Sequence, residues 1–331
     1  MTVDDAAPLR WGVIGATSWV AARAVIPAIV ASPSARLVAA ASQAASGPPV
    51  HDGCRTYRSY DALLADPEVD VVYVPLPNSL HRSWVERAAL AGKHVLCEKP
   101  LATTASDAAA MATACAAAGV ILLEAYMTPF HPRACGVAAL VAGGRLGDLR
   151  FARAAFTGVL ARAHDHRWRP EMGGGALLDV GVYCVAPLLA AAGRPPVRVE
   201  AAASRAPSGA DASFAGWLDF GDGFTAAIEC SFEAPERQLL EIVGTESAVL
   251  VDRAFTPGPG DRAFLLRRRD GRADEIVAGG GDPYQAMIEH VHEVVRAGVT
   301  PRWSAADAIA VLAVLDRLRA AAGVAARCGG P

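Results

Sequence analysis

Lys99 is the residue whose chemical type most needs an explanation. The chain contains 31 Lys plus Arg, and only Lys93 and Lys99 are lysines. A compact, titratable ammonium can perform chemistry that the forked guanidinium of arginine cannot, so a lysine kept in this arginine-rich chain indicates either a specific role or chance. Lys99 ends a short apolar run, follows Glu98 and precedes Pro100. Lys93 follows Gly92, and we expect it only to solvate a loop.

Asp179 and Tyr183 form a second set of residues suited to chemistry. They lie four residues apart in an apolar segment that we predict to be helical, which places both side chains on one face. Three glycines, 173–175, precede them and let the backbone approach a ligand or a neighbouring segment closely. A phenol can exchange a proton with a substrate oxygen when a nearby ammonium stabilises the phenolate. The alternative is a glycine hinge into a core helix, with Tyr183 packed as an ordinary aromatic side chain.

A polar loop precedes these glycines and is predicted to bind substrate. Arginine forks grip phosphate or carboxylate groups, and a tryptophan can stack on a sugar ring or a base. An anionic or polyhydroxyl substrate would suit this mixture, while a solvated charged loop is the alternative. The residues are His164, His166, Arg167, Trp168 and Arg169, and Arg162 could join them.

Gly15 follows a predicted strand and opens a predicted helix, the setting in which backbone N–H groups bind a dinucleotide pyrophosphate. The glycine fingerprint is incomplete, because Thr17 and Val20 stand where a full motif has glycines. Hydroxyl hydrogen bonds from Thr17 and Ser18 could replace part of the missing contacts. An ordinary strand-to-helix turn is the alternative.

The residues after the second predicted strand bear on the choice of cofactor. Ser42 and Gln43 follow that strand, and no carboxylate is present to accept a hydrogen bond from the ribose 2′-hydroxyl of NAD. This composition favours NADP, with NAD as the other option. Arg55 or Arg58 could supply the cation for a 2′-phosphate. The segment between Gln43 and Tyr57 is too short for the helix that usually follows this strand.

Short apolar runs alternate with helical segments in the first third of the chain. Such runs are typical of strands covered on both faces, as in a parallel sheet. We predict strands at 11–14, 37–41, 69–74, 95–97 and 120–123, with helices to about residue 30, at 79–91 and at 106–118. This alternation predicts an α/β, doubly wound Rossmann domain over residues 1–124.

Hairpin signals replace the helical connections after Glu124. Alternating strands are predicted at 214–220, 224–232, 239–243 and 248–251, with a further turn at Asp270 and Gly271. Helical segments are predicted at 132–141, 176–192, 284–297 and 305–322. We therefore expect an α+β domain over 125–331 with a large, mostly antiparallel sheet, and a last helix able to pack back on the first domain. Helices or a second subunit must cover the faces of that sheet.

Composition argues against several classes of protein. The formal net charge is −3 without a dense basic cluster, which predicts no nucleic-acid partner and no membrane surface. The seven cysteines are scattered without zinc-binding spacing, so we expect reduced thiols and no metal. The N-terminus lacks an apolar leader, and the longest apolar segments are interrupted by Asp107 and Asp179. We expect a cytoplasmic protein.

Four runs, in this order, resemble the Gfo/Idh/MocA family of nicotinamide-dependent oxidoreductases. They are VDVVYVPLPNSLH at 69–81, AGKHVLCEKPLATT at 91–104, EAYMTPFHPR at 124–133 and GGGALLDVGVY at 173–183. The fold that the resemblance implies, a Rossmann domain followed by a domain with a large antiparallel sheet, agrees with the elements predicted above.

The resemblance also implies roles for particular residues. It implies that Lys99, Asp179 and Tyr183 are catalytic, with Asp179 accepting hydrogen bonds from a substrate hydroxyl. Substrate contacts are expected for His166, Arg167 and Trp168 from the composition of their loop, and for Asp179 from the resemblance. Cofactor contacts are implied for Gly15, Thr17, Ser18, Trp19, Ser42, Gln43, Pro75, Leu76, Asn78, His81, Glu98 and Lys99.

The implied reaction is reversible hydride transfer between NADP(H) and a sugar-like or cyclic hydroxyl or ketone. Tyr183 resembles the branch that includes glucose-fructose oxidoreductase, dihydrodiol and xylose dehydrogenases, and nucleotide-sugar 3-ketoreductases. A catalytically inactive NAD(P)-binding regulatory protein of the same fold is the alternative, which the incomplete glycine turn would suit. A homodimer or homotetramer formed through the C-terminal sheet is also implied.

Overall fold

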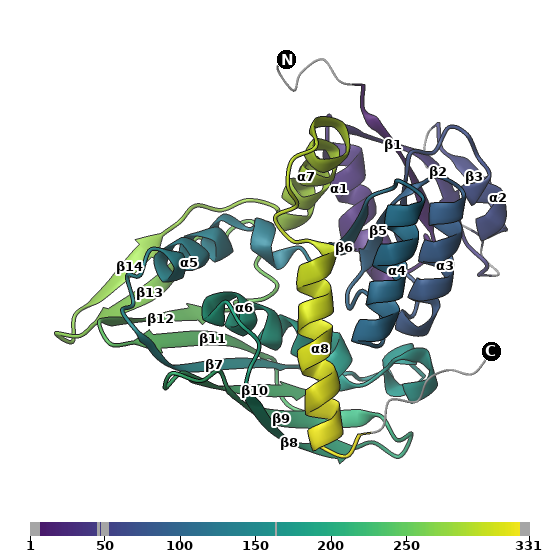
Figure 1. Cartoon of the computed structure of the whole chain (residues 1–331). Helices are drawn as coiled ribbons and strands as arrows, with labels where there is room; N and C mark the ends of the chain where they lie inside the picture. Colours follow the sequence, from purple (N-terminus) through teal and green to yellow (C-terminus); the bar gives the residue numbers. More distant parts are fainter. Residues whose placement is uncertain (1–6, 45–46, 48–52, 163, 325–331) are drawn as a thin grey trace. The chain divides into compact units, whose positions relative to one another are not determined.

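The computed structural model describes residues 7–44, 47, 53–162 and 164–324. The chain forms two compact units, and each is assembled from separate stretches of sequence. The first comprises Met1–Ala102, Ser106–Met127 and Asp282–Ile309, and the second comprises Thr103–Ala105, Thr128–Gly281 and Ala310–Pro331. Each unit contains one large sheet (Figure 1).

Six parallel strands form the sheet of the first unit, in the order β3-β2-β1-β4-β5-β6. The order reverses at β1, which pairs with β2 on one side and with β4 on the other. The central strands are almost wholly buried, as expected for strands with helices on both faces. The strands are β1 (Leu9–Ile14), β2 (Ala35–Ala41), β3 (Arg55–Tyr57), β4 (Val71–Val74), β5 (His94–Glu98) and β6 (Leu122–Ala125).

Helices connect these strands. A π-helix, η2 (Ala21–Val25), and α1 (Ile26–Ala31) follow β1, and α2 (Tyr60–Leu64) follows β3. Two longer helices, α3 (Asn78–Leu90) and α4 (Ala105–Ala117), follow β4 and β5 and lie side by side (Figure 1). From the far end of the sequence, α7 (Pro283–Ala297) packs against α1, and the Asp282 carboxylate caps it by accepting from the Tyr284 and Gln285 N–H groups.

Eight strands form the sheet of the second unit, in the order β14-β13-β12-β11-β7-β10-β9-β8. All neighbours are antiparallel except β7 and β10, which run parallel. Burial alternates along β9 and β10, so one face of these strands packs inward. The strands are β7 (Leu149–Thr157), β8 (Arg198–Arg205), β9 (Asp211–Asp219), β10 (Thr225–Ser231), β11 (Arg237–Gly244), β12 (Ser247–Asp252), β13 (Ala263–Arg268) and β14 (Ala273–Val277).

Helices cover one face of this second sheet. A second π-helix, η6 (Leu177–Gly181), leads into α6 (Val182–Ala192), which packs on β7 and β10. Beside α6 lies α5 (Pro132–Ala142) over the same face (Figure 1). Short 3₁₀ turns are η3 (Thr128–Phe130), η4 (His166–Trp168) and η5 (Pro170–Met172), while α8 (Ala305–Ala321) begins in the first unit and ends in the second.

The helical segment Pro170–Ala192 is long and apolar enough to cross a membrane by length and composition alone. However, 61% of its most apolar 18-residue stretch is buried inside the protein, where α6 packs against β7 and β10. Such burial is typical of the core helix of a globular unit. The segment is therefore a core element that carries Asp179 and Tyr183.

The predicted fold class, a Rossmann-type parallel sheet followed by a large, mostly antiparallel sheet, is confirmed. No prediction covers β3, α2, β7 or β8, and the helix expected up to residue 30 contains the π-helical turn η2. The described residues between β2 and β3 contain no helix, as expected. Residues 45, 46 and 48–52 of that connection lie outside the described part.

Candidate active site

The residues expected to bind a cofactor gather at one edge of the first sheet. The carboxyl ends of parallel strands lie at the same edge, and ligands bind where the strand order reverses. That point lies here at β1, between β2 and β4. The candidate residues are Gly15, Thr17, Ser18 and Trp19 after β1, Ser42 and Gln43 after β2, Pro75, Leu76, Asn78 and His81 after β4, and Glu98 and Lys99 where β5 ends.

Gly15 makes the turn between β1 and the following helix. Its φ is +71°, and a Cβ at this position would lie 2.7 Å from Leu76 Cδ2, so glycine is required here. The Ser18 hydroxyl accepts a hydrogen bond from the Ala21 N–H at 3.1 Å, and Trp19 beside it is 63% exposed. The turn therefore retains the strand–glycine–helix geometry that suits a pyrophosphate, although the later glycines are absent.

Ser42 organises the end of β2. Its hydroxyl lies 3.0 Å from the Thr17 hydroxyl and accepts a hydrogen bond from the Ala44 N–H at 3.1 Å. Arg58, just beyond β3, donates from Nη1 to the Ala44 carbonyl oxygen at 2.9 Å. Arg58 and the exposed Gln43 therefore lie beside the segment where this fold receives the ribose of the adenosine half.

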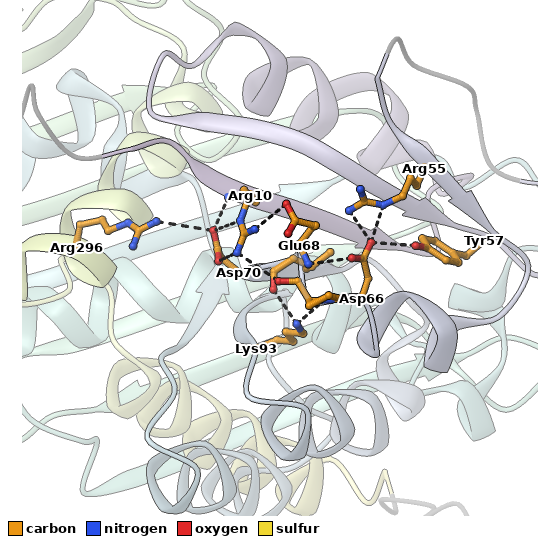
Figure 2. Close-up of polar contacts among 10 residues, drawn as sticks. Arg10, Arg55, Tyr57, Asp66, Glu68, Asp70, Lys93 and Arg296 are labelled. Atoms are coloured by element: carbon orange, nitrogen blue, oxygen red, sulfur yellow. Dashed lines mark hydrogen bonds and ion pairs between the residues drawn. The ribbon is translucent and has the colours of Figure 1, made fainter.

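Arg55 and Lys93 belong instead to a polar cluster near the amino ends of the strands (Figure 2). Arg55 is paired with the Asp66 carboxylate at 2.7 Å, which separates its role from that of Arg58. Lys93 is only 8% exposed, and its ammonium donates to the carbonyl oxygens of Asp66 at 2.8 Å and Val69 at 2.9 Å. The prediction that Lys93 only solvates a loop is therefore wrong, because the ammonium is turned inward to two backbone acceptors.

His81 is fully buried in α3 and joins the loops that follow β4 and β5. Its Nε2 lies 2.8 Å from the Leu76 carbonyl oxygen, and its Nδ1 lies 3.1 Å from that of Pro100 and 3.3 Å from that of Leu101. Both ring nitrogens face carbonyl oxygens, which only accept hydrogen bonds, so the imidazole donates from the nitrogen that carries the proton. His81 thus positions two segments that carry predicted cofactor residues.

Lys99 is partly exposed in the turn after β5, and its peptide bond to Pro100 is cis. Its backbone N–H donates to the Glu98 carboxylate at 3.1 Å, and the Tyr73 hydroxyl donates to the same carboxylate at 2.6 Å. Burial and the charge of Glu98 raise the pKa of Tyr73 well above its usual value, so this phenol remains a donor. Because Glu98 is only 8% exposed and accepts from the Lys99 N–H, it is a buried anchor for the start of the turn.

Tyr183 and Asp179 lie in the second unit, on α6 and on the π-helix before it. The Tyr183 side chain is largely buried, with ring centroids 5.3 Å from Phe156 and 6.3 Å from Phe255. The Asp179 side chain is 17% exposed. Single π-helical turns are frequent at functional sites, because they displace side chains from regular helical positions.

Arg167 contacts two carboxylates in the loop before the glycines. It holds Asp165 through Nε and Nη2, each at 3.0 Å, and its Nη1 lies 3.4 Å from Asp179 Oδ2. Burial disfavours the ionised form of Asp165, but the hydrogen bonds from Arg167 outweigh it and lower the pKa of this carboxyl to about 2. Arg167 therefore forms an ion pair with Asp165 and also contacts Asp179.

Trp168 and His166 are also fixed by the loop. The Trp168 indole N–H donates to the Leu160 carbonyl oxygen at 3.3 Å, and its ring meets Phe232 edge-on at 5.2 Å. His166 Nδ1 lies 3.4 Å from the Asp165 carboxylate. This packing orders a loop that would otherwise be solvated.

The second and third glycines before Asp179 are explained by neighbouring atoms that leave no room for a side chain. A Cβ on Gly174 would lie 2.4 Å from the Arg167 carbonyl oxygen, and one on Gly175, whose φ is +118°, would lie 2.1 Å from Asp211 Oδ1. The other carboxylate oxygen of Asp211 accepts from the Leu177 N–H at 2.7 Å. The glycines therefore seat the Asp179 segment on the loop that carries Arg167 and on a buried carboxyl group.

Two family models match most of the chain. Residues 9–126 match an oxidoreductase family with an NAD-binding Rossmann fold, and residues 136–250 match a Gfo/Idh/MocA C-terminal domain. The chain belongs to the Gfo/Idh/MocA oxidoreductase family. The resemblance drawn from the four sequence runs is thus confirmed, and with it a nicotinamide-dependent oxidoreductase that acts on CH–OH groups.

Several relatives of this Gfo/Idh/MocA chain are named for sugar substrates. It is 36% identical to a D-xylose 1-dehydrogenase (NADP⁺) of Haloferax volcanii, over 94% of this chain and 96% of the relative. It is also 36% identical to a dTDP-3,4-didehydro-2,6-dideoxy-α-D-glucose 3-reductase of Streptomyces violaceoruber, over 95% of each chain. Among solved structures, a variant of a 3-ketoreductase from Actinomadura kijaniata, with TDP-benzene and NADP, has a TM-score of 0.87 at 30% identity, covering 95% of this chain and 97% of that one.

Two buried carboxyl groups of this Gfo/Idh/MocA member were outside the sequence predictions. They are Asp211, described above, and Glu124, where β6 ends under the turn that carries Lys99. Glu124 is a charged residue at the end of the apolar run 120–123 and opens the family-like run 124–133, but neither signal assigns it a role. Among the described residues, six cysteines are free thiols and no cluster of His, Cys, Asp or Glu could hold a metal.

Proposed function

We propose that this chain is an NADP(H)-dependent oxidoreductase that interconverts a hydroxyl and a ketone on a sugar-like or cyclic substrate. A nucleotide-sugar 3-ketoreductase and a xylose or dihydrodiol dehydrogenase are the two substrate types, in line with relatives of both kinds. The observation that carries the proposal is the position of Lys99. It follows β5 at the carboxyl edge of a Rossmann sheet, anchored by a buried carboxylate.

The first unit fits a dinucleotide on its own geometry. Gly15 keeps the phosphate turn free of a Cβ, and the end of β2 carries hydroxyl and amide groups with no carboxylate. The nearby Arg58 supplies a cation for a 2′-phosphate, which supports NADP over NAD. When bound, the nicotinamide supplies or accepts the hydride.

The residues of the second unit complete the proposed chemistry. Tyr183 transfers the proton to or from the reacting substrate oxygen, and Lys99 stabilises the phenolate form and donates to the same oxygen. Asp179 accepts a hydrogen bond from a neighbouring substrate hydroxyl. The loop residues His166, Arg167 and Trp168 line the proposed substrate site. The buried surroundings of Tyr183 limit the access of water to the phenol.

Cofactor titration followed by a substrate screen tests this function. NADPH and NADH are titrated by fluorescence, and then aldoses, cyclic dihydrodiols and dTDP-linked keto-sugars are screened for cofactor turnover. We expect tighter binding of NADPH and turnover of one sugar class. Binding without any turnover would instead match the non-catalytic regulator.

Two substitutions assign the chemistry to named residues. Tyr183→Phe removes only a hydroxyl, so hydride transfer should fall by about 10²–10⁴-fold while NADPH binding remains. Lys99→Met should be more severe, because the proposal gives this ammonium two roles, one toward the phenolate and one toward the substrate oxygen. Full turnover of Tyr183→Phe would move the acid role to another group, with His166 first, and an active Lys99→Met enzyme would refute the central role of Lys99.

The exposed face of the second sheet supports a homodimer or homotetramer. Phe151 on β7 is 63% exposed and Leu265 on β13 is 37% exposed, beside the ion pairs that Glu229 forms with Arg153 and Arg237. Phe151→Arg should lower the mass measured by light scattering if this face is the interface. Free thiols agree with a reducing compartment, so we also propose a cytoplasmic location, with a small-molecule substrate and neither nucleic acid nor membrane as partner.

A further inference from the structure

Glu124 lies directly beneath the turn that carries Lys99. It is the third residue of β6, next to β5 in the sheet, and is 2% exposed. One carboxylate oxygen accepts from the Leu101 N–H at 2.6 Å, and the other accepts from the Trp303 indole N–H at 2.7 Å. The Leu101 peptide thus ties the chain two residues beyond Lys99 to this carboxyl group.

The turn is also held from its other side. The Leu101 carbonyl oxygen faces the buried His81 ring, and the Lys99 N–H donates to Glu98. The turn therefore has three anchors, at the start, at the Leu101 N–H and at the Leu101 carbonyl. Of the three, Glu124 is a carboxyl group that lies inside the unit and accepts directly from the Leu101 N–H.

We propose that Glu124 is a positioning residue for Lys99, and that its ionisation governs how firmly the Lys99 turn is held. The inference rests on the proposed function, in which Lys99 takes part in the reaction. An ionised carboxylate is a stronger acceptor than a neutral carboxyl group, so the charged form binds the Leu101 N–H more tightly. The charged form also attracts the Lys99 ammonium, whereas the neutral form does not.

The surroundings determine the pH at which this change occurs. Burial raises the pKa of Glu124 to about 7, and the charge of Glu98 acts in the same direction. The hydrogen bonds from Trp303 and Leu101 and the charge of Lys99 oppose the rise. Cys97 of β5 faces Glu124, whereas Tyr73 of β4 and Tyr284 of α7 face Glu98; all three have a raised pKa and stay neutral across this range. The His81 ring of α3 faces the Leu101 carbonyl oxygen.

Two expectations follow for the wild-type protein. Turnover should rise as pH increases through about 7, because the ionised form holds the turn best. Stability should change in the opposite direction. Since the folded pKa exceeds the usual value of 4.5, the stabilising contribution of this group is complete below about 4.5 and is lost as pH rises through about 7.

Two variants should change the pH dependence of turnover in different, predictable ways: one should abolish the rise through neutral pH and the other should move its midpoint upward. Glu124→Gln removes the titration and one acceptor, so turnover should fall about 10-fold or more and should lose its rise through neutral pH. Trp303→Phe keeps an aromatic ring beside Tyr126, 4.8 Å away in the wild type, but removes the indole donor that favours the ionised form. Its pH midpoint should therefore shift upward. Asp66→Asn, in the polar cluster near the amino ends of the strands, is the control that should keep the wild-type midpoint.

Infrared difference spectroscopy of the unliganded protein tests the titration without any substrate. The protonated-carboxyl band of Glu124 should disappear near pH 7 in the wild type, be missing from Glu124→Gln, and disappear at higher pH in Trp303→Phe. The band of Asp211, whose pKa burial raises to about 6, should remain in both variants. If Glu124→Gln does not fold, the Trp303→Phe shift decides the question. An unchanged midpoint in Trp303→Phe, or a wild-type pH profile in Glu124→Gln, would overturn the inference. Absence of turnover in the wild type would overturn the proposed function instead, and the infrared bands would still decide the titration.

Discussion

The Arg167 guanidinium lies 3.4 Å from the Asp179 carboxylate while it holds Asp165 through two contacts of 3.0 Å. Burial alone would lower the pKa of Arg167, but the two carboxylates outweigh burial and raise it, so the side chain stays charged. A substrate phosphate would have to compete with both carboxylates for this cation. The arrangement suggests that Arg167 orients Asp179 for a substrate hydroxyl.

Replacing Arg167 distinguishes a role in orienting Asp179 from a role in binding a substrate phosphate. In Arg167→Met we expect kcat/KM to fall by about 10- to 100-fold, the equivalent of one hydrogen bond to a charged group of about 1.5–3 kcal/mol. If Arg167 orients Asp179, the loss should be equal for a free sugar and its nucleotide-linked form. Arg167→Lys should rescue only partly, because a lysine cannot form the two-pronged contact with Asp165. A loss confined to nucleotide-linked sugars would show that Arg167 binds the phosphate.

The close contact between Gly175 and Asp211 gives a prediction about stability. Gly175→Ala places a Cβ 2.1 Å from Asp211 Oδ1 and also requires a positive φ, so the free energy of unfolding should fall by more than the backbone cost alone. Gly193→Ala is the matched control, since Gly193 has a φ of +65° with no atom within 4 Å of the added Cβ. We expect a loss of about 1–2 kcal/mol for the control and a clearly larger loss for Gly175→Ala in urea unfolding. Equal losses would contradict this contact.

The fold could be predicted where local sequence and tertiary environment agree. The run 95–97 predicts β5 because a strand buried on both faces must be apolar throughout. In contrast, β7 and β8 have the sequences LRFARAAFT and RVEAAASR, in which alanines favour helix and arginines break the apolar pattern. Their strand conformation comes from pairing with β10, β11 and β9, which no local pattern reports.

The candidate site could be predicted only in part for a similar reason. Lys99, Asp179 and Tyr183 stand out by residue type and spacing, and the family resemblance supplies their proposed roles. Glu124 and Asp211 are not, because the donors that give them a role, Trp303 and Leu177, lie 179 and 34 residues away in sequence. The inward orientation of Lys93 depends likewise on backbone acceptors of another loop.

Arg58 is expected to determine the preference for NADPH. Arg58→Ala removes the cation beside Ala44 at the end of β2, so the ratio of NADH to NADPH dissociation constants should fall by about 10- to 100-fold, the equivalent of a charge-assisted contact. Fluorescence titration with both cofactors measures this ratio. Arg55→Ala is the control, because Arg55 pairs with Asp66 and should affect stability while leaving the preference intact. An unchanged ratio in Arg58→Ala would exclude Arg58 as the 2′-phosphate ligand.

Lys93 is expected to stabilise the first unit through its two backbone contacts. Lys93→Met keeps an unbranched side chain but leaves the buried carbonyl oxygens of Asp66 and Val69 without their ammonium donor, so the free energy of unfolding should fall by about 2–4 kcal/mol. Arg82→Met, which removes an exposed cation paired with Glu86, should cost at most about 1 kcal/mol. Because burial lowers the pKa of Lys93, the wild-type protein should gain stability as pH rises toward the usual lysine value of 10.5, and Lys93→Met should lose that gain. Urea unfolding at several pH values measures both effects, and equal costs for the two variants would mean that the Lys93 contacts contribute no more than a surface ion pair.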